Sequence, residues 1–253
     1  MNETNPQSGV TLIEVLIAVS LLSLLSVGML VAMRLGFNTM DKTDARLVRN
    51  RRVSNTSRII ENEINGFIST MAAYHPQPNQ PNNTNLVPFF QIEPQVMRFV
   101  TSYSLDDAWR GRLQIAVLQV IPGDANRGVR LILNEIPYTG QEQAGQQIEA
   151  IEPDPATGLP IVHYVPVAPG PQSFVLADRL AYCRFSWLEP RPTPPFQQWR
   201  PDWVQPRILP LGIRIEMAPL EAATRTDLRI STITAPLNVN RTPGANYADF
   251  QTQ

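Results

Sequence analysis

The residue whose position most needs a chemical explanation is Glu14. It stands at the head of an apolar run that continues from Val15 to Met33. A charged side chain inside a bilayer costs about 2.5–3.5 kcal/mol on insertion scales. The segment from Val10 to Met33 is long enough to cross the hydrocarbon core, which takes about 20 helical residues. A carboxylate placed there is expected to serve a function and to find a partner.

The other reactive side chains form no enzyme signature. The chain has two histidines, His75 and His163, which stand far apart, and one cysteine, Cys183. It contains no G-x-S-x-G, H-E-x-x-H or Walker sequence. Cys183 alternates with Ala181 and Phe185, which predicts a buried and inert thiol on a strand. A lone cysteine also excludes an intrachain disulfide. We therefore expect no enzyme, no catalytic residue and no cofactor.

Two further clusters leave a choice between a functional and a structural interpretation. Glu152, Asp154 and Thr157 offer oxygen atoms, but the segment lacks the glycine turn and oxygen density of a calcium loop, so we interpret it as a solvated loop without a metal site. In the segment from 196 to 203, Trp199 and Trp203 are a possible partner contact, because interfaces use aromatic and arginine residues as anchors. They suit a lid over the core equally well.

The elements that position these residues begin with a long helix. Apolar residues recur every three or four positions from Leu35 to Met71, and Pro76 follows. This spacing predicts a helix that continues past the membrane to Ala73. Its apolar face (Ile60, Ile64, Phe67 and Met71) is expected to cover a sheet. Its charged residues are interpreted as a solvated face: Arg49, Arg51, Arg52, Arg58, Glu61 and Glu63.

The remainder of the chain has the pattern of strands. The segment from His75 to Pro94 is interpreted as an irregular connector, Pro190 to Pro195 as a stiff spacer, and the tail after Pro236 as loosely ordered. A turn at Pro122, Gly123 and Asp124 favours antiparallel hairpins. The expected strands are Val96–Thr101, Arg112–Ile121, Gly128–Ile136, Pro160–Val167, Arg179–Leu188, Arg207–Met217 and Asp227–Thr234.

Composition limits the possible classes. With 253 residues and 43% hydrophobic content, the chain can form the membrane helix and one domain of roughly 180 residues. The net charge of −1 gives no sign of a nucleic-acid partner. The fold class is therefore α+β, with a long N-terminal helix and a C-terminal antiparallel sheet packed on its second half.

The segment Gly9-Val-Thr-Leu-Ile-Glu-Val-Leu-Ile-Ala18 resembles the class III signal of type IV pilins and type II secretion pseudopilins. The resemblance implies a pilin-like fold, cleavage by prepilin peptidase between Gly9 and Val10, and N-methylation of Val10. It also implies an assembly role for Glu14, whose carboxylate would pair with the new amine of a neighbouring subunit. A secretory signal peptide or signal anchor is the alternative, but the start lacks basic residues and an A-x-A-like exit.

The second half resembles minor pseudopilin J of the type II secretion system. The resemblance rests on the strand Arg179–Trp187, the tryptophan-containing loop, and the segment Leu209-Pro-Leu-Gly-Ile-Arg-Ile-Glu-Met217. It implies a structural protein at the tip of the pseudopilus that supports protein export across the outer membrane. PilW-like minor pilins of type IV pili, which act in priming or adhesion, share this two-part pattern and remain the alternative. An anchored periplasmic enzyme has only the missing signatures against it.

The resemblance also implies an organisation. Residues 1–9 are expected to be a prepilin leader, 10–33 a transmembrane helix, 34–73 a periplasmic stem helix and 74–253 a periplasmic β-rich domain. The protein would cross the bacterial inner membrane once. Its partners would be the I and K minor pseudopilins, prepilin peptidase and inner-membrane lipid, with no small-molecule substrate.

Overall fold

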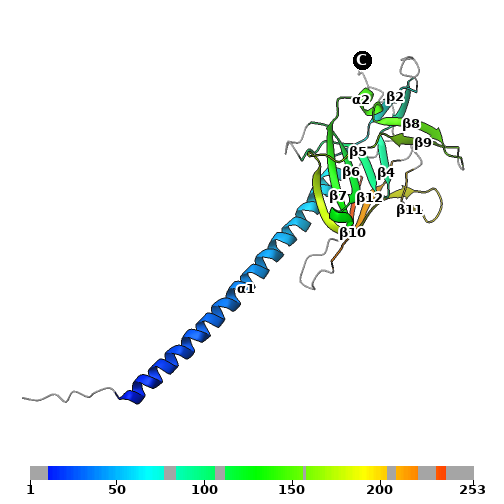
Figure 1. Ribbon diagram of the computed structural model, residues 1–253. Coiled ribbons are helices and arrows are strands. Elements are labelled where there is room, and N and C mark those ends of the chain that lie inside the picture. Colours follow the sequence, from blue (N-terminus) through cyan, green and yellow to red (C-terminus); the bar gives the residue numbers. More distant parts are fainter. Residues whose placement is uncertain are drawn as a thin grey trace, which may run out of the picture. The chain divides into compact units, whose positions relative to one another are not determined.

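The computed structural model describes residues 11–76, 84–105, 112–155, 158–203, 209–221 and 232–237. The chain divides into two compact units, residues 1–50 and 51–253. Helix α1 (Leu12–Asn65) has residues in both units. All other described elements belong to the second unit, which Figure 1 shows with its strands labelled.

The first unit contains the apolar part of α1. Residues Leu12–Phe37 form a continuous stretch of 26 residues that is long and apolar enough to cross a membrane, and its side chains are exposed. Its three hydroxyl groups donate to main-chain carbonyls four residues earlier, as Ser20 does to Leu16 O at 2.7 Å. Ser23 and Ser26 form the same bond. Polar side chains that are satisfied within the helix make this segment compatible with lipid.

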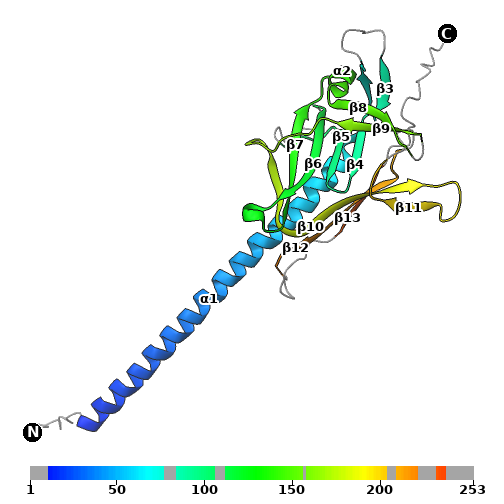
Figure 2. The same cartoon turned by 45° about the vertical axis from the view of Figure 1, so that its right-hand side comes forward.

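The second unit is built on an antiparallel sheet of nine strands. The order along the sheet is β1 (Phe67–Ile68), β5 (Val96–Thr101), β6 (Gln114–Pro122), β7 (Val129–Pro137), β10 (Phe174–Pro190), β12 (Gly212–Pro219) and β13 (Ile233–Pro236). Strand β4 (Phe90–Glu93) also pairs with β5, and β11 (Gln197–Arg200) pairs with the far end of β10. Figure 2 shows the long β10 and its yellow partner β11.

One face of the sheet packs on the last turns of α1. Ile60 and Ile64 are fully buried and share a core with Phe90, Phe99 and Phe185. A hydrogen bond also joins α1 to β10: Thr56 Oγ1 donates to Leu176 O at 2.5 Å. The expected sheet on a helix is therefore confirmed, and the fold is a pilin-like α+β fold.

The opposite face carries smaller elements. These are the pair β2 (Met71–Tyr74) and β3 (Asn85–Pro88), the short helix α2 (Gln141–Gly145), and the pair β8 (Ile148–Pro153) and β9 (Pro160–Tyr164). They cover a second core that contains Ala72, Val100, Val117 and Ala144. A side chain at Gly145 would overlap the Ala73 carbonyl, so glycine is required where α2 meets β2.

The helix ends earlier than the spacing predicted. α1 stops at Asn65 rather than Ala73, and Phe67–Ile68 and Met71–Tyr74 are strands. A side chain at Gly66 would stand 2.5 Å from Thr101 Oγ1, so glycine is required where the chain leaves α1 and passes β5. Phe67 and Ile68 then pair with Thr101 and Val100. Short apolar runs satisfy both the helical and the strand period, which is why the spacing misled.

Other predictions on the chain path need correction as well. The expected connector from His75 to Pro94 contains strands β3 and β4, and the expected spacer from Pro190 to Pro195 lies in the hairpin between β10 and β11. Strand Val96–Thr101 is confirmed with its bounds, and the hairpin turn at Gly123 is closed by a bond from its N–H to Gly128 O. Strands β8 and β11 were not predicted. Residues 77–83, 207–208, 227–231 and 238–253 of the predicted segments lie outside the described residues.

Candidate functional site

The start of α1 holds Glu14 in a specific geometry. Thr11 donates to Glu14 Oε2 twice, from its main-chain N–H at 3.0 Å and from its Oγ1 hydroxyl at 3.1 Å. In the other direction, the N–H groups of Glu14 and Val15 donate to Thr11 O at 3.1 and 3.3 Å. The Glu14 carboxylate thus accepts the N–H of the residue three positions earlier, at the start of the helix, which is one half of the arrangement called a capping box.

The sequence contains a signal for this contact, which the expectation for Glu14 did not include. A threonine three residues ahead of a glutamate, before an apolar run, is the pattern of a capping box. Glu14 therefore has a partner inside its own subunit, and the positive end of the helix dipole favours its charge. Both Thr11 contacts go to Oε2, so Oε1 can accept a donor from another subunit. Gly9 and Val10 lie outside the described residues.

Trp203 lies on the core. Its ring packs edge-on against Phe90, with centroids 5.0 Å apart and planes at 88°. The main-chain N–H of Trp203 donates to Ile92 O at 3.0 Å. The indole N–H of Trp187 donates to Asp202 O at 2.8 Å. The lid interpretation therefore accounts for Trp203.

Trp199 has a different environment. It lies on β11 opposite Leu188, and the Arg214 guanidinium stands 3.8 Å from its ring centroid. The two tryptophans therefore have different environments. Trp203 covers the core, whereas the ring of Trp199 is stacked by Arg214. Cation–π stacking of this kind contributes about 0.5–1 kcal/mol at exposed sites.

Cys183 is a core residue, as the strand pattern predicted. It is 3% exposed, on the face of β10 that carries Phe185 and Trp187. Burial raises the pKa of its thiol to about 12. A thiol that stays protonated in this way is a poor nucleophile.

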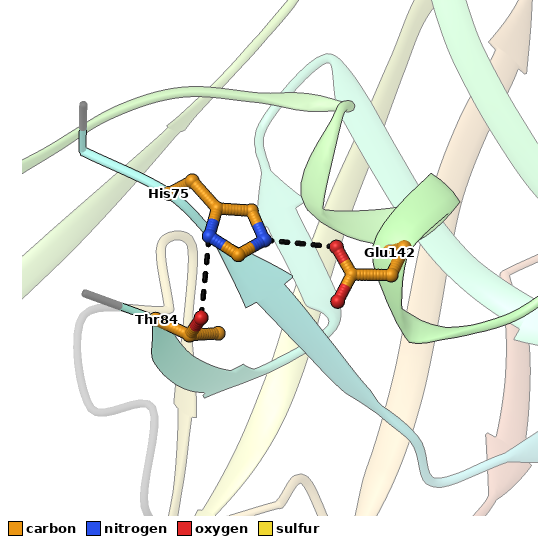
Figure 3. A network of polar contacts seen from close by, with 3 residues as sticks. All are labelled: His75, Thr84 and Glu142. Carbon is orange, nitrogen blue, oxygen red and sulfur yellow. Dashed lines mark hydrogen bonds and ion pairs between the residues drawn. The ribbon is translucent and has the colours of Figure 1, made fainter. Parts of the chain in front are cut away.

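The two histidines belong to separate networks. His75 follows β2, accepts or donates at Nδ1 with Thr84 Oγ1 at 3.2 Å, and contacts Glu142 Oε2 of α2 from Nε2 at 2.8 Å (Figure 3). His163 on β9 lies 3.9 Å from Glu152 Oε2 on β8. The first network joins both ends of the β2–β3 loop to α2, so its role in the fold is to fasten one element to another.

The segment considered for calcium forms a turn. Gly158 N–H donates to Asp154 O at 2.7 Å, and Asp154 N–H donates to Leu159 O at 2.8 Å. Among the residues that the structure describes, no group of three or more His, Cys, Asp or Glu side chains is placed to hold a metal ion. Thr157 lies outside those residues.

Glu63 departs from its predicted place on a solvated helix face. Arg51, Arg58 and Glu61 are exposed as expected, whereas Glu63 is 0% exposed and its carboxyl oxygens have no hydrogen-bond partner in the described part of the chain. The side chains of Arg49 and Arg52 are not described. Burial, followed by the charge of Glu135 on β7, raises the pKa of Glu63 to about 9. The side chain is therefore a neutral acid at neutral pH.

Glu135 is the acceptor in this pair. Its carboxylate receives Leu105 N–H at 2.6 Å and Ser104 Oγ at 3.0 Å. Burial and this neighbouring charge both favour the protonated, neutral form of Glu63. Helical spacing of charged residues gave no signal of this, because only the ends of α1 and β7 together create the burial.

Arg98 is a buried cation on β5. It donates to Gln147 O at 3.3 Å and Val165 O at 2.8 Å, and its guanidinium lies 4.9 Å from the Tyr164 ring centroid. Burial lowers the pKa of Arg98. These bonds join β5 to one end of the β8–β9 pair, where Gln147 precedes β8 and Val165 follows β9.

Comparison with known proteins identifies the N-terminal part. Residues 4–30 match the family described as the prokaryotic N-terminal methylation motif. No curated protein matches the chain. The matched residues include the segment before Glu14 and most of the apolar stretch of α1, which places the motif on the described helix start.

The match has consequences for processing and location. It gives the chain the N-terminal methylation motif, the signal that prepilin peptidase processes in type IV pilins and pseudopilins. Together with the apolar helix, it indicates an inner-membrane anchor and a periplasmic domain. The chain therefore carries the N-terminal methylation motif of the type IV pilin and pseudopilin class, ahead of an apolar helix and a C-terminal antiparallel sheet.

Proposed function

We propose that the protein is a minor pseudopilin of the type II secretion system, most similar to the J subunit, that assembles at the pseudopilus tip. The observation that carries this proposal is the two-part pattern of the second half. Its parts lie on β10 and β12, which pair directly, with Cys183 opposite Met217 and Phe185 opposite Ile215. The tryptophan-containing segment between them forms β11 and the cover over Phe90.

Maturation precedes assembly in this proposal. Prepilin peptidase cuts between Gly9 and Val10 and methylates the new amine of Val10. Thr11 then becomes the second residue, with its N–H and hydroxyl on Glu14. The capping box holds the carboxylate at the helix start, where it can also meet the Val10 amine of the adjacent subunit.

The partners follow from the same class. The I and K minor pseudopilins are the expected neighbours, and inner-membrane lipid surrounds the stretch Leu12–Phe37. Trp199 on β11 is the part of the aromatic loop that remains a candidate contact, because its ring is not built into the core.

Crosslinking mass spectrometry of the assembled complex in cells tests the proposal. We expect crosslinks between the domain of this chain and the I and K pseudopilins, and loss of secreted enzymes from the medium when the chain is deleted. A deletion that leaves secretion intact but abolishes surface pili would instead make the protein a PilW-like minor pilin.

A further inference from the structure

A small pocket lies between two strands of the domain. Its volume is about 260 Å³, and it is lined by β4, by β9, and by Asp202 and Trp203. Sites for drug-sized ligands measure about 300–1,000 Å³. This pocket therefore suits one long side chain rather than a cofactor or a folded element.

Aromatic rings form part of the wall, and their positions are fixed. The Tyr164 hydroxyl donates to Phe90 O at 3.2 Å, which holds β9 over β4. The main-chain N–H of Trp203 donates to Ile92 O, and its ring contacts Phe90, so both interactions hold Trp203 in place. The pocket is thus preformed, which lowers the entropy cost of binding.

The polar part of the wall consists of acceptors. Gln91 Nε2 donates to Glu93 Oε1 at 2.7 Å, which fixes the orientation of the amide group. The remaining oxygen, Gln91 Oε1, is buried and has no hydrogen-bond partner in the described ranges of the chain. Arg98, which stands opposite Gln91 in the β4–β5 pair, has a buried Nε that is equally unpartnered in these ranges, so Gln91 Oε1 is not counted as an acceptor for an outside group. Glu93 and Asp202 add two exposed carboxylates to the same lining.

One protein cation lies nearby and must be counted. Arg98 stands directly opposite Gln91 in the β4–β5 pair, and its charge interacts with Glu93. Its NH1 and NH2 groups already bond Gln147 O and Val165 O. Among the described residues, the charge of Glu93 is thus offset by Arg98, and Asp202 adds a further carboxylate to the lining.

These features select the occupant. An arginine guanidinium is planar, carries five donors and no acceptor, and stacks on aromatic rings, whereas a lysine ammonium is a compact and strongly hydrated charge. We propose that this pocket binds an arginine side chain on an exposed segment of a partner protein, with its guanidinium between Glu93 and Asp202 and against Trp203. This contact is separate from assembly through Glu14 at the helix start.

The test uses the full chain in detergent micelles with 5-fluorotryptophan, whose Trp203 signal is assigned through Trp203→Phe. The probes are acetyl-glycyl-arginyl-glycinamide, the same peptide with citrulline, which has the shape of arginine without its charge, and free arginine. We expect a saturable shift of the Trp203 signal, with the arginine peptide binding at least threefold more tightly than the citrulline peptide and more tightly than free arginine. The double variant Glu93→Gln/Asp202→Asn should lose this preference, whereas Glu149→Gln, a carboxylate outside the lining, should keep it.

Each other result overturns the proposal. Equal affinity for arginine and citrulline peptides would show that charge is not recognised. An unchanged preference in the double variant would place the binding elsewhere, and tighter binding of free arginine would indicate a small-molecule site. An unshifted Trp203 signal at millimolar peptide, with Glu149→Gln and the wild type folded alike, would show that the pocket is unoccupied by such a group.

Discussion

At the scale of single residues, Glu14 has one hydrogen-bonding partner in its own subunit and one proposed partner in a neighbouring subunit. Within the subunit it accepts two bonds from Thr11, and in the proposed assembly it meets the amine of Val10 from a neighbour. The intrasubunit contact lowers the cost of placing a charge at the membrane surface before any neighbour arrives. The carboxylate is then ready for assembly without reorganisation.

Glu14→Ala should leave the subunit in the membrane and folded, because it removes an insertion cost of about 2.5–3.5 kcal/mol and touches no part of the second unit. It should reduce co-purification of the I and K pseudopilins from detergent. Thr11→Val is the matched control: it removes the hydroxyl bond but keeps the carboxylate, so co-purification should fall less. Undiminished co-purification and normal secretion in Glu14→Ala would show that the carboxylate is dispensable for assembly.

Glu63 makes stability depend on pH. Its folded pKa of about 9 lies above the ordinary value of 4.5, so the folded state holds a proton that the unfolded state has lost over this interval. The contribution of Glu63 to the free energy of unfolding should therefore be largest below pH 4.5, fall as pH rises, and level off above pH 9.

Glu63→Gln should remove most of this dependence, because an amide is neutral at every pH of the experiment and no longer has to hold a proton in the buried site. Urea unfolding of the full chain, followed by tryptophan fluorescence, should give similar stability for variant and wild type near pH 5. At pH 9 the variant should be more stable by about 1–3 kcal/mol. Glu61→Gln, an exposed neighbour on the same helix, should follow the wild type at both pH values. Parallel pH profiles for wild type and Glu63→Gln would mean that Glu63 is ionised in the fold.

At the scale of elements, close approaches of backbone decide where helices end. Gly66 passes Thr101, and Gly145 meets the Ala73 carbonyl. Both are places where two elements are drawn together more tightly than a side chain permits. Such contacts depend on a partner far away in the sequence, and local spacing carries no information about them.

Gly145→Ala should push α2 away from β2 and destabilise the domain by about 1–3 kcal/mol. Gly170→Ala provides the control, because a side chain there meets nothing within 4 Å. The midpoint of urea unfolding should fall for Gly145→Ala and remain near the wild-type value for Gly170→Ala. Equal midpoints would show that α2 can shift without cost.

The end of α1 is part of the domain core. Deletion of residues 1–33 should give a folded, soluble fragment, because Ile60 and Ile64 stay in place. Deletion of residues 1–65 removes both side chains from the sheet face and should cause aggregation, since that face is apolar. Size-exclusion chromatography and urea unfolding distinguish the two. A shorter fragment that resists urea as well as the longer one would contradict the packing of helix on sheet.

At the scale of the whole molecule, the proposed cleavage between Gly9 and Val10 can be tested directly. Gly9→Leu should leave an uncut precursor, because the peptidase site accepts a residue without a side chain at this position. Insertion through Leu12–Phe37 should be unaffected. Intact-mass analysis should show a methylated chain beginning at Val10 for the wild type and the full-length chain for the variant. Cleavage after an A-x-A-like site, or no cleavage of the wild type, would remove the proposed processing.

The sequence by itself determined the membrane helix, its motif, most central strands and the buried Cys183. These features are local: a continuous apolar run, a short motif and alternation along one strand are visible without knowing what packs against them. The Thr11–Glu14 capping pattern is also local and can be read from the sequence, although it was recognised only in the structure.

Only the tertiary structure decided the end of α1, the strands in the expected connector, the burial of Glu63 near Glu135, and the pocket of Gln91 and Asp202. Each depends on segments distant in the chain that meet in space. Burial changes a solvated glutamate into a neutral acid, and a passing strand changes a helical spacing into a turn, because both effects come from neighbours that local spacing cannot assign.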